Sequence, residues 1–242
     1  MGTVFSFDVR NPPAGTDVGR ALDEAVAWLH WVDVTFSTYK ASSEVSRFDA
    51  GELPAGRCCA EMRHVIALCH RYGELTAGYF DAWATGRFDP SGLVKGWAVQ
   101  EASLLLARRG LLDHVVDGGG DVVLSGGPGP GQAWRVGVKH PSVPGAFCAG
   151  LWLEAGAVAT SGTYERGQHI IVPFTGRPAT ELVSVSVVGP DLVAADAFAT
   201  AALAMGVAAP DWLGGLESYE SQVVSARGRG WSTPGFKALA AS

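Results

Sequence analysis

The chain has 242 residues, of which 48% are hydrophobic and 17% charged, and its formal net charge is −6. This balance excludes a disordered or fibrous chain, and it is a poor match for a broad nucleic-acid surface. The length suits one large domain or two small ones. We therefore expect a globular protein that binds no nucleic acid, while a local basic pocket for a phosphorylated small molecule stays open.

The first half of the chain predicts a strand followed by helices. Residues from Thr3 to Arg10 alternate like a strand, and apolar residues recur at a helical period from about Asp17 to Val32. Residues 36–51 are polar with little periodicity, which predicts a loop with short turns. Helices are expected again over residues 61–77 and from about Leu93 to Arg109.

The second half predicts mostly strands. The stretches with strand-like composition are HVVDGGGDVVLSG, AWRVGVKH, AFCAGLWLEAG, AVATSG, QHIIVP and LVSVSVVG. A helix is expected over 194–207, and ESQVVSARG is a late strand. Because helices and strands come in blocks and not in strict alternation, we expect an α+β fold with a mixed, largely antiparallel sheet, in one compact domain over residues 1–242.

Cysteine usage and the N-terminus bear on the compartment. The cysteines Cys58, Cys59, Cys69 and Cys148 have no spacing typical of a disulfide framework or a zinc site. The N-terminus has no basic leader with an apolar run, and no apolar run reaches the length of a membrane span. We therefore expect a cytoplasmic protein without a membrane anchor, in which Cys69 is an ordinary core cysteine.

The segment FDPSGLVKGWA, residues 88–98, has two interpretations. In the simpler one, Asp89 and Ser91 cap a helix that carries an exposed lysine. In the other, Gly92 lets the backbone approach a ligand, and the N–H groups at the helix start hold a phosphate together with the charge of Lys95. Neither a phosphate-binding P-loop nor a dinucleotide-binding glycine fingerprint is present.

Two further segments are rich in glycine and polar residues. VVDGGGDVV, residues 115–123, indicates either a tight turn between strands or bare backbone against a flat ligand or a pyrophosphate. The segment 158–176 gathers Thr160, Ser161 and His169 but lacks the nucleophile elbow of serine hydrolases. His169 fits an ordinary strand position as well as a functional one.

The helix predicted over 194–207 contains one acid, Asp196, in an otherwise apolar stretch. A lone carboxylate is costly to bury unless something pairs with it. Asp196 and Thr200 are four residues apart, so their side chains share a helix face and can converge on one small ion. A hard cation such as Mg²⁺ takes one or two protein oxygens and fills its other positions from phosphates and water. A capping role for Asp196, or a bond from Thr200 to a backbone carbonyl, stays open as the alternative.

In chain order, eight segments together resemble the FAD:protein FMN transferase family, also called ApbE-like. They are MGT at 1–3, FSTYKASSEVSRFD at 36–49, TAGYFD at 76–81, FDPSGLVKGWAV, VDGGGDVVLSG, AVATSGTYER, HIIVPFTG and ADAFATAALAMG. The resemblance spans nearly the whole chain and implies a duplicated α+β fold with FAD bound between the halves. It also implies an enzyme that uses Mg²⁺ to transfer the FMN moiety of FAD to a Thr or Ser hydroxyl of an acceptor flavoprotein, leaving AMP.

The resemblance implies roles for individual residues. Asp196 and Thr200 are similar to the family's side-chain metal ligands, the carbonyl of Gly92 to a backbone ligand, and Lys95 to the lysine beside that site. Contacts with the flavin or the adenosine are implied for Met1, Tyr39, Phe80, Asp81, Lys95, Gly119, Thr163 and His169. The implied catalytic residues are Asp196, His169 and Lys95. Asp196 and His169 are both candidates for the base that takes the proton of the acceptor hydroxyl, and the sequence does not choose between them.

One position departs from the family pattern. The family usually has His-Ile-Ile-Asp-Pro where this chain has HIIVP, with Val172 in place of the acid. Two alternatives to transfer stay open, and the missing acid motivates the second of them. One is an FAD pyrophosphatase that releases FMN and AMP without an acceptor, and the other is a non-catalytic protein that binds FAD.

Overall fold

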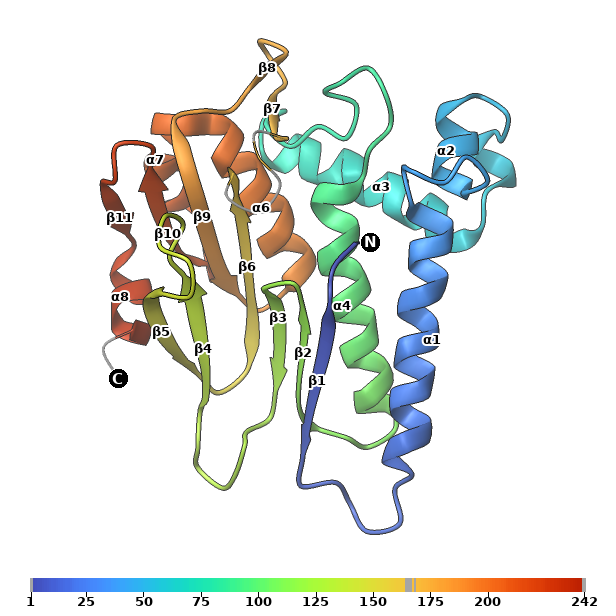
Figure 1. The fold of residues 1–242 in the computed structure, drawn as a ribbon, viewed down its shortest axis with the longest axis vertical. Coiled ribbons are helices and arrows are strands. Elements are labelled where there is room, and N and C mark those ends of the chain that lie inside the picture. The colour runs from blue at the N-terminus through green and yellow to red at the C-terminus, as the bar shows by residue number, and fades with distance from the viewer. Residues whose placement is uncertain (1, 164–166, 168, 241–242) are drawn as a thin grey trace.

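The computed structural model describes residues 2–163, 167 and 169–240. Its main feature is an antiparallel sheet with helices packed against one face (Figure 1). Within the described residues this sheet has seven strands in the order β1-β2-β3-β6-β9-β10-β11. The strand bounds are β1 (Phe5–Arg10), β2 (Asp113–Gly118), β3 (Asp121–Ser125), β6 (Gly156–Gly162), β9 (Leu182–Gly189), β10 (Glu220–Ser225) and β11 (Gly230–Ser232).

The helices form a layer behind the sheet. Helices α4 and α6 pack against the strands and against each other, and α1 packs on α4 (Figure 1). The helix bounds are α1 (Val18–Phe36), α2 (Glu44–Asp49), α3 (Ala60–Leu75), α4 (Ser91–Arg108), α6 (Leu192–Met205), α7 (Ala209–Leu213) and α8 (Pro234–Ala240). Most of the buried apolar side chains lie between this layer and the sheet, so the main core fixes how α4 and α6 sit relative to each other.

The two halves of the sheet repeat one topology. In the first half β1 is followed by helices that end with α4 and then by the hairpin β2–β3, whereas in the second half β9 is followed by α6 and later by the hairpin β10–β11. In both halves the strand before the helix pairs with the first strand of the hairpin. Strand β6 joins the halves by pairing with β3 and β9. This repeat agrees with the duplicated α+β fold that the resemblance implies.

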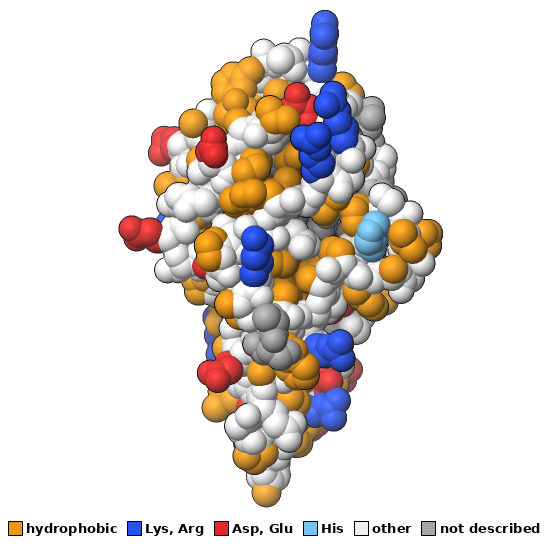
Figure 2. Space-filling view, turned by 90° about the vertical axis from the view of Figure 1, so that its left-hand side faces the viewer, with side chains coloured by type: hydrophobic (Ala, Val, Ile, Leu, Met, Phe, Trp, Pro, Cys, Tyr) orange, Lys and Arg blue, Asp and Glu red, His pale blue; other side chains and the backbone are white. Residues whose placement is uncertain are grey.

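The opposite face of the sheet carries a smaller core. It is covered by α8 and by the two-stranded sheet of β4 (Trp134–Lys139) and β5 (Phe147–Leu153). On the side of the molecule seen in Figure 2, Lys and Arg side chains are scattered between hydrophobic patches and form no continuous basic band.

Most of the expected elements are confirmed, and the largest boundary difference is at the end of α1. Asp17 caps this helix by accepting a hydrogen bond from the Arg20 N–H at 3.0 Å. The helix runs on to Phe36, past the predicted end at Val32, because Thr35 and Phe36 continue its buried face. The α+β fold class and the antiparallel pairing of the strands are confirmed as well.

Two expectations are wrong in part. The predicted loop over 36–51 contains the short helix α2, because Ser43 caps it through the Ser46 N–H at 3.1 Å and one apolar residue, Val45, anchors it. The strand expected over QHIIVP shrinks to β7 (Ile171–Val172), which turns back at once to pair with β8 (Arg177–Pro178). The elements α7, α8, β8 and β11 were not expected, since each is too short to show a period.

The segment Leu192–Leu213 corrects the expectation about apolar runs, because by length and composition it is apolar enough to cross a membrane. In the structure, 83% of that window is buried inside the protein, and the segment comprises α6, a 3₁₀ turn at Gly206–Ala208 and α7. Its burial and its interruption by a 3₁₀ turn are features of a core segment in a globular protein.

The cysteines behave as the spacing predicts. All four are unpaired with one another, and Cys69 lies in the main core. Burial raises the pKa of the Cys69 thiol to about 12, so this side chain stays neutral at physiological pH.

Candidate active site between helices α4 and α6

A glycine contact sets how closely α4 and α6 approach. A Cβ atom on Gly96 of α4 would lie 2.8 Å from the Leu192 carbonyl oxygen and 2.9 Å from the Asp196 Cβ, both on α6. Only glycine leaves room for this approach. The Asp196 side chain therefore reaches α4, where its Oδ2 accepts a hydrogen bond from the Gly96 N–H at 2.9 Å.

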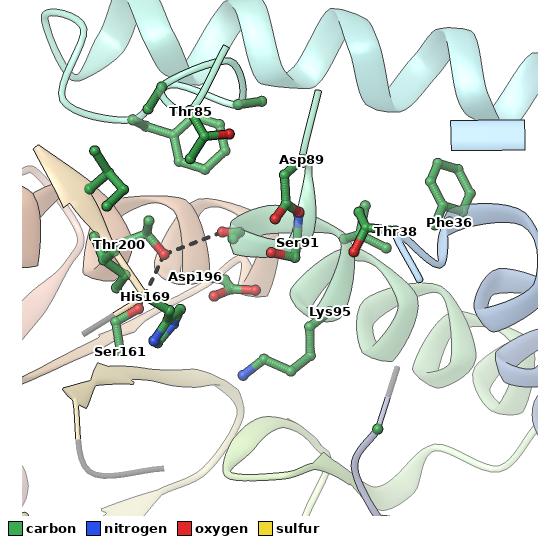
Figure 3. Close-up of a pocket in the computed structure, with 18 of the residues that line it drawn as sticks. Phe36, Thr38, Thr85, Asp89, Ser91, Lys95, Ser161, His169, Asp196 and Thr200 are labelled. Atoms are coloured by element: carbon green, nitrogen blue, oxygen red, sulfur yellow. Dashed lines mark hydrogen bonds between the residues drawn. The ribbon is translucent and has the colours of Figure 1, made fainter. Parts of the chain in front are cut away.

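Three residues that the sequence assigns to a metal site come together at this contact. The Thr200 hydroxyl lies 3.4 Å from the Gly92 carbonyl oxygen, to which it donates. Asp196 lies one turn before Thr200 on the same face of α6, as Figure 3 shows. A fourth oxygen comes from Ser161 of β6, whose Oγ is 3.1 Å from the Thr200 Oγ1. The sequence placed Ser161 in a polar segment but gave it no role.

A second carboxylate lies beside Asp196, and the sequence did not assign it. Asp121, the first residue of β3, is fully buried and forms an ion pair with Lys95 of α4. Asp196 is 3% exposed. Burial and the charge of Asp121 raise the pKa of Asp196, and the Lys95 charge and the Gly96 N–H oppose that shift. The contact between α4 and α6 therefore forms a corner of the site that holds two buried carboxylates, Asp196 and Asp121, and the ammonium group of Lys95.

These groups fit a hard divalent cation. Carboxylate, hydroxyl and carbonyl oxygens are the ligands that Mg²⁺ prefers, and two buried carboxylates against one ammonium leave an excess of negative charge. No group of three or more His, Cys, Asp or Glu side chains suited to a metal occurs in the part of the chain that the structure describes. A cation at this corner would thus depend on the Thr200 hydroxyl and the Gly92 carbonyl as well as on Asp196.

The corner forms one wall of a cavity of about 610 Å³, which is within the usual range for small-molecule sites. The cavity brings together nearly all the residues that the resemblance implies. Its lining includes Tyr39, Phe80, Asp81, Gly92, Lys95, Gly119, His169, Asp196 and Thr200. It also includes residues that the sequence did not assign, among them Phe36, Thr38, Tyr79, Thr85 and Ser91. Phe36 and Thr38 shortly precede Tyr39 in the chain, and Tyr79 and Ser91 directly precede Phe80 and Gly92. Closeness in the chain to an expected residue was therefore the available signal.

The implied flavin and adenosine residues differ in how they meet the cavity. Tyr39 is 97% exposed at the rim, whereas Phe80 is 3% exposed and packs beneath Gly92. Asp81 is exposed. Gly119 lies in the two-residue turn of the β2–β3 hairpin with φ +69°, and a Cβ there would collide with the Thr3 hydroxyl. The glycine segment is therefore a tight turn and a piece of cavity wall at once.

Some predicted residues are not placed in the cavity. Thr163, the residue that follows the end of β6 at Gly162, does not line it. Val172 of β7 does not line it either and packs against the main core. Met1 lies outside the described residues. Ser91 is not the expected helix cap but the first residue of α4, and Asp89 alone accepts a hydrogen bond there, from the Ser91 N–H at 3.0 Å.

His169 lies at the mouth of the cavity. Its Nδ1 is 3.0 Å from the Gly167 carbonyl oxygen. Because a carbonyl oxygen only accepts, this contact assigns a hydrogen to Nδ1, so in the neutral ring Nε2 is the nitrogen that can accept. Figure 3 shows the imidazole on the same side of the cavity as Ser161 and Asp196.

Comparison with known proteins shows the family of the chain. A family model described as the ApbE family matches residues 1–86 and 83–222. The FAD:protein FMN transferase of Vibrio cholerae is 36% identical over 129 residues, which are 49% of this chain and 38% of that protein. The protein of the same name from Salmonella typhimurium is 29% identical over 167 residues, 64% of this chain and 48% of that protein. The matched region thus spans less than half the length of these relatives.

A solved structure shares the fold along nearly the whole chain. The flavin transferase ApbE from Vibrio cholerae superposes with a TM-score of 0.83 at 22% identity, over 99% of this chain and 96% of that chain. Fold and site together define an α+β protein with an oxygen-lined cavity between two helices, suited to phosphates and a hard cation. The family model covers most of the sequence, and the chain belongs to the ApbE family.

Proposed function

We propose that the protein transfers the FMN moiety of FAD to a Thr or Ser hydroxyl of an acceptor flavoprotein, with Mg²⁺ as cofactor and AMP as the second product. One observation carries this proposal. The Asp196 carboxylate, the Thr200 hydroxyl and the Gly92 carbonyl converge on the wall of a cavity of about 610 Å³. The family and its relatives named FAD:protein FMN transferase support the reaction class.

The residues of the corner would hold the cation and the diphosphate of FAD. Asp196, Thr200 and Gly92 supply the cation's protein oxygens. When bound there, Mg²⁺ neutralises charge on the diphosphate and favours departure of the AMP phosphate. Lys95 lines the same wall and adds a positive charge where the diphosphate lies.

His169 is the base in this proposal. The acceptor oxygen forms a bond to the phosphorus of the FMN part, the bond from that phosphorus to the oxygen bridging to AMP breaks, and the hydroxyl proton passes to the His169 Nε2. The hydrogen bond to Gly167 orients the ring and leaves that nitrogen as an acceptor. Asp196 suits this role less well, because it is buried, bonded to the Gly96 N–H and assigned to the cation.

The replacement at Val172 does not change the donors of the cavity. Its side chain packs against the core, and its carbonyl accepts the N–H groups of Thr175 and Gly176 at 3.1 and 2.9 Å in the β7–β8 turn. The oxygens around Asp196 and Thr200 come from other positions in the chain. We therefore favour a catalytic protein over one that only stores FAD.

The test is incubation with FAD, Mg²⁺ and a flavoprotein that carries the target threonine, followed by mass spectrometry of the acceptor. Transfer predicts an adduct with the mass of FMN and an equal amount of AMP. FMN and AMP with no adduct would instead identify an FAD pyrophosphatase, and bound FAD without turnover would identify a binding protein. Action on a cytoplasmic acceptor stays a prediction.

A further inference from the structure

Asp121 lies behind the wall of the cavity and does not line it. It follows directly on the Gly119–Gly120 turn of the β2–β3 hairpin and is fully buried. Its Oδ1 accepts a hydrogen bond from the Thr160 N–H of β6 at 3.1 Å. Its Oδ2 forms the ion pair with the ammonium of Lys95, and the Asp121 carboxyl group also interacts with Asp196. Such a carboxylate needs its counter-ion, because burying a charge without a partner is costly.

Lys95 is within electrostatic reach of two carboxylates. It pairs with Asp121 and also acts on the charge of Asp196. Figure 3 shows its side chain extending from α4 into the corner where Asp196 lies. If the Lys95 ammonium paired with Asp196, it would neutralise the negative charge that attracts the metal cation. It would also occupy the place of that cation. The ion pair with Asp121 prevents this.

We propose that Asp121 is a positioning residue, which holds the Lys95 ammonium away from Asp196 and at the diphosphate, so that Asp196 remains available to the cation. This inference rests on the proposed function. Asp121 does not line the cavity, so in this role it acts on the ligands through Lys95. Its bond to Thr160 also fixes β6 next to Ser161, which completes the hydroxyl pair with Thr200.

The matched variant is Asp121→Asn, which keeps an oxygen for the Thr160 N–H and removes only the charge. Without that charge, Asp196 remains a buried carboxylate that interacts electrostatically with Lys95. We expect the affinity for ADP in the presence of Mg²⁺ to fall about tenfold, as for loss of one charged contact in a site of low dielectric. ADP carries a diphosphate but lacks the bond to be broken, so calorimetry measures binding without turnover.

A double-mutant cycle separates positioning from a structural role. If Asp121 acts only through Lys95, then Lys95→Met and the double variant Lys95→Met/Asp121→Asn bind ADP and Mg²⁺ equally weakly, so the two effects are not additive. A role confined to stability would lower the melting temperature and leave the Mg²⁺-dependent affinity unchanged. Should Asp121→Asn fail to fold, the double variant, which leaves neither charge unpaired, is compared with Lys95→Met alone.

The outcomes distinguish this inference from the proposed function. Wild-type protein that binds neither FAD nor ADP with Mg²⁺ would overturn the proposed function and this inference with it. Wild-type binding together with unchanged affinity in Asp121→Asn, or a further loss in the double variant relative to Lys95→Met, would overturn the role of Asp121 alone.

Discussion

The two halves of the molecule share a topology but contribute different chemistry to the cavity. Helix α4 of the first half offers backbone and positive charge at its start, through Gly92 and Lys95. Helix α6 of the second half is buried along almost its whole length and offers one carboxylate and one hydroxyl, Asp196 and Thr200. Neither half holds all of the oxygens proposed for the cation, so the proposed site exists only where the halves meet.

The hairpins of the two halves also contribute differently to the cavity. The first half's hairpin, β2–β3, brings Gly119 to the cavity and Asp121 behind its wall. Its counterpart β10–β11 instead supports α8, where Glu220 accepts a hydrogen bond from the Phe236 N–H at 3.1 Å. A repeated fold has thus kept both helices in the site but only one hairpin. Function after duplication depends on the seam between the repeats and not on either repeat alone.

The second half's carboxylate should matter most. Replacing Asp196 by Ala removes the side-chain anion of the proposed ligand set, so we expect the Mg²⁺-dependent turnover of FAD to fall by about 100-fold or more. The measurement is the rate of AMP release across a Mg²⁺ titration. Asp211, an exposed acid on α7, provides the control as Asp211→Ala. Wild-type Mg²⁺ dependence in the Asp196 variant would refute the metal assignment.

The hydroxyl of the same half should have a smaller effect. Thr200→Val keeps the shape of the side chain but removes the oxygen that contacts Gly92 and Ser161. We expect about a tenfold loss of turnover and a higher Mg²⁺ requirement. Thr200→Ser retains the oxygen and should retain most of the activity. Equal rates for the Val and Ser variants would show that the oxygen takes no part.

The contact between α4 and α6, where the two halves meet, can be tested through Gly96. In Gly96→Ala the new methyl group meets the Leu192 carbonyl and Asp196, so α4 and α6 must separate. Overpacking of this kind costs about 1–3 kcal/mol of unfolding free energy, and turnover should fall as well because Asp196 moves from Gly92. Denaturant unfolding gives the first quantity. The control is Gly56→Ala, where a Cβ would have no atom within 4 Å. A loss as large at Gly56 would mean that the close approach is not the cause.

Sequence reasoning found the parts of the site that are local in the chain. The spacing of Asp196 and Thr200 and the glycines near Lys95 are visible in short windows, because a helix fixes which residues share a face. The role of Gly96 was not visible. A glycine within a helix can serve a ligand or a neighbouring helix, and only the packing of α6 on α4 decides between them.

Long-range pairing explains what the sequence missed. Asp121 is joined to Lys95 and Thr160, residues that are distant in the chain and come from two other elements. Its importance depends on burial and on a counter-ion, and neither follows from the glycine turn that precedes it. Likewise α2 went unpredicted, because its stability comes from a cap and one buried valine and not from a repeating pattern. The fold class was easier, since it depends on many weak periodic signals at once.

The smallest effect on turnover is expected in a part of the first half away from the site. His114 of β2 is fully buried, with Nδ1 2.7 Å from the Leu111 carbonyl and Nε2 2.7 Å from the Ser103 hydroxyl. Leu111 only accepts, so Nδ1 carries the hydrogen and the neutral ring accepts from Ser103. Desolvation by burial lowers the pKa of His114, and the bond to Leu111 and the charge of Asp113 oppose that shift.

The direction of the pH effect follows from this lowered pKa. Below the ordinary His pKa of about 6.5 the unfolded chain takes up a proton that the folded protein resists, so the free energy of unfolding falls as the pH drops. In His114→Ala this contribution to the slope between pH 7 and 5 should vanish, and stability at pH 7 should fall by about 1–3 kcal/mol because Ser103 and Leu111 lose their partner. Urea unfolding across pH measures both, with the exposed His30→Ala as control. An unchanged slope of unfolding free energy against pH in the His114 variant would assign the acid sensitivity to other groups. Full Mg²⁺-dependent turnover is expected in that variant, because His114 does not line the cavity.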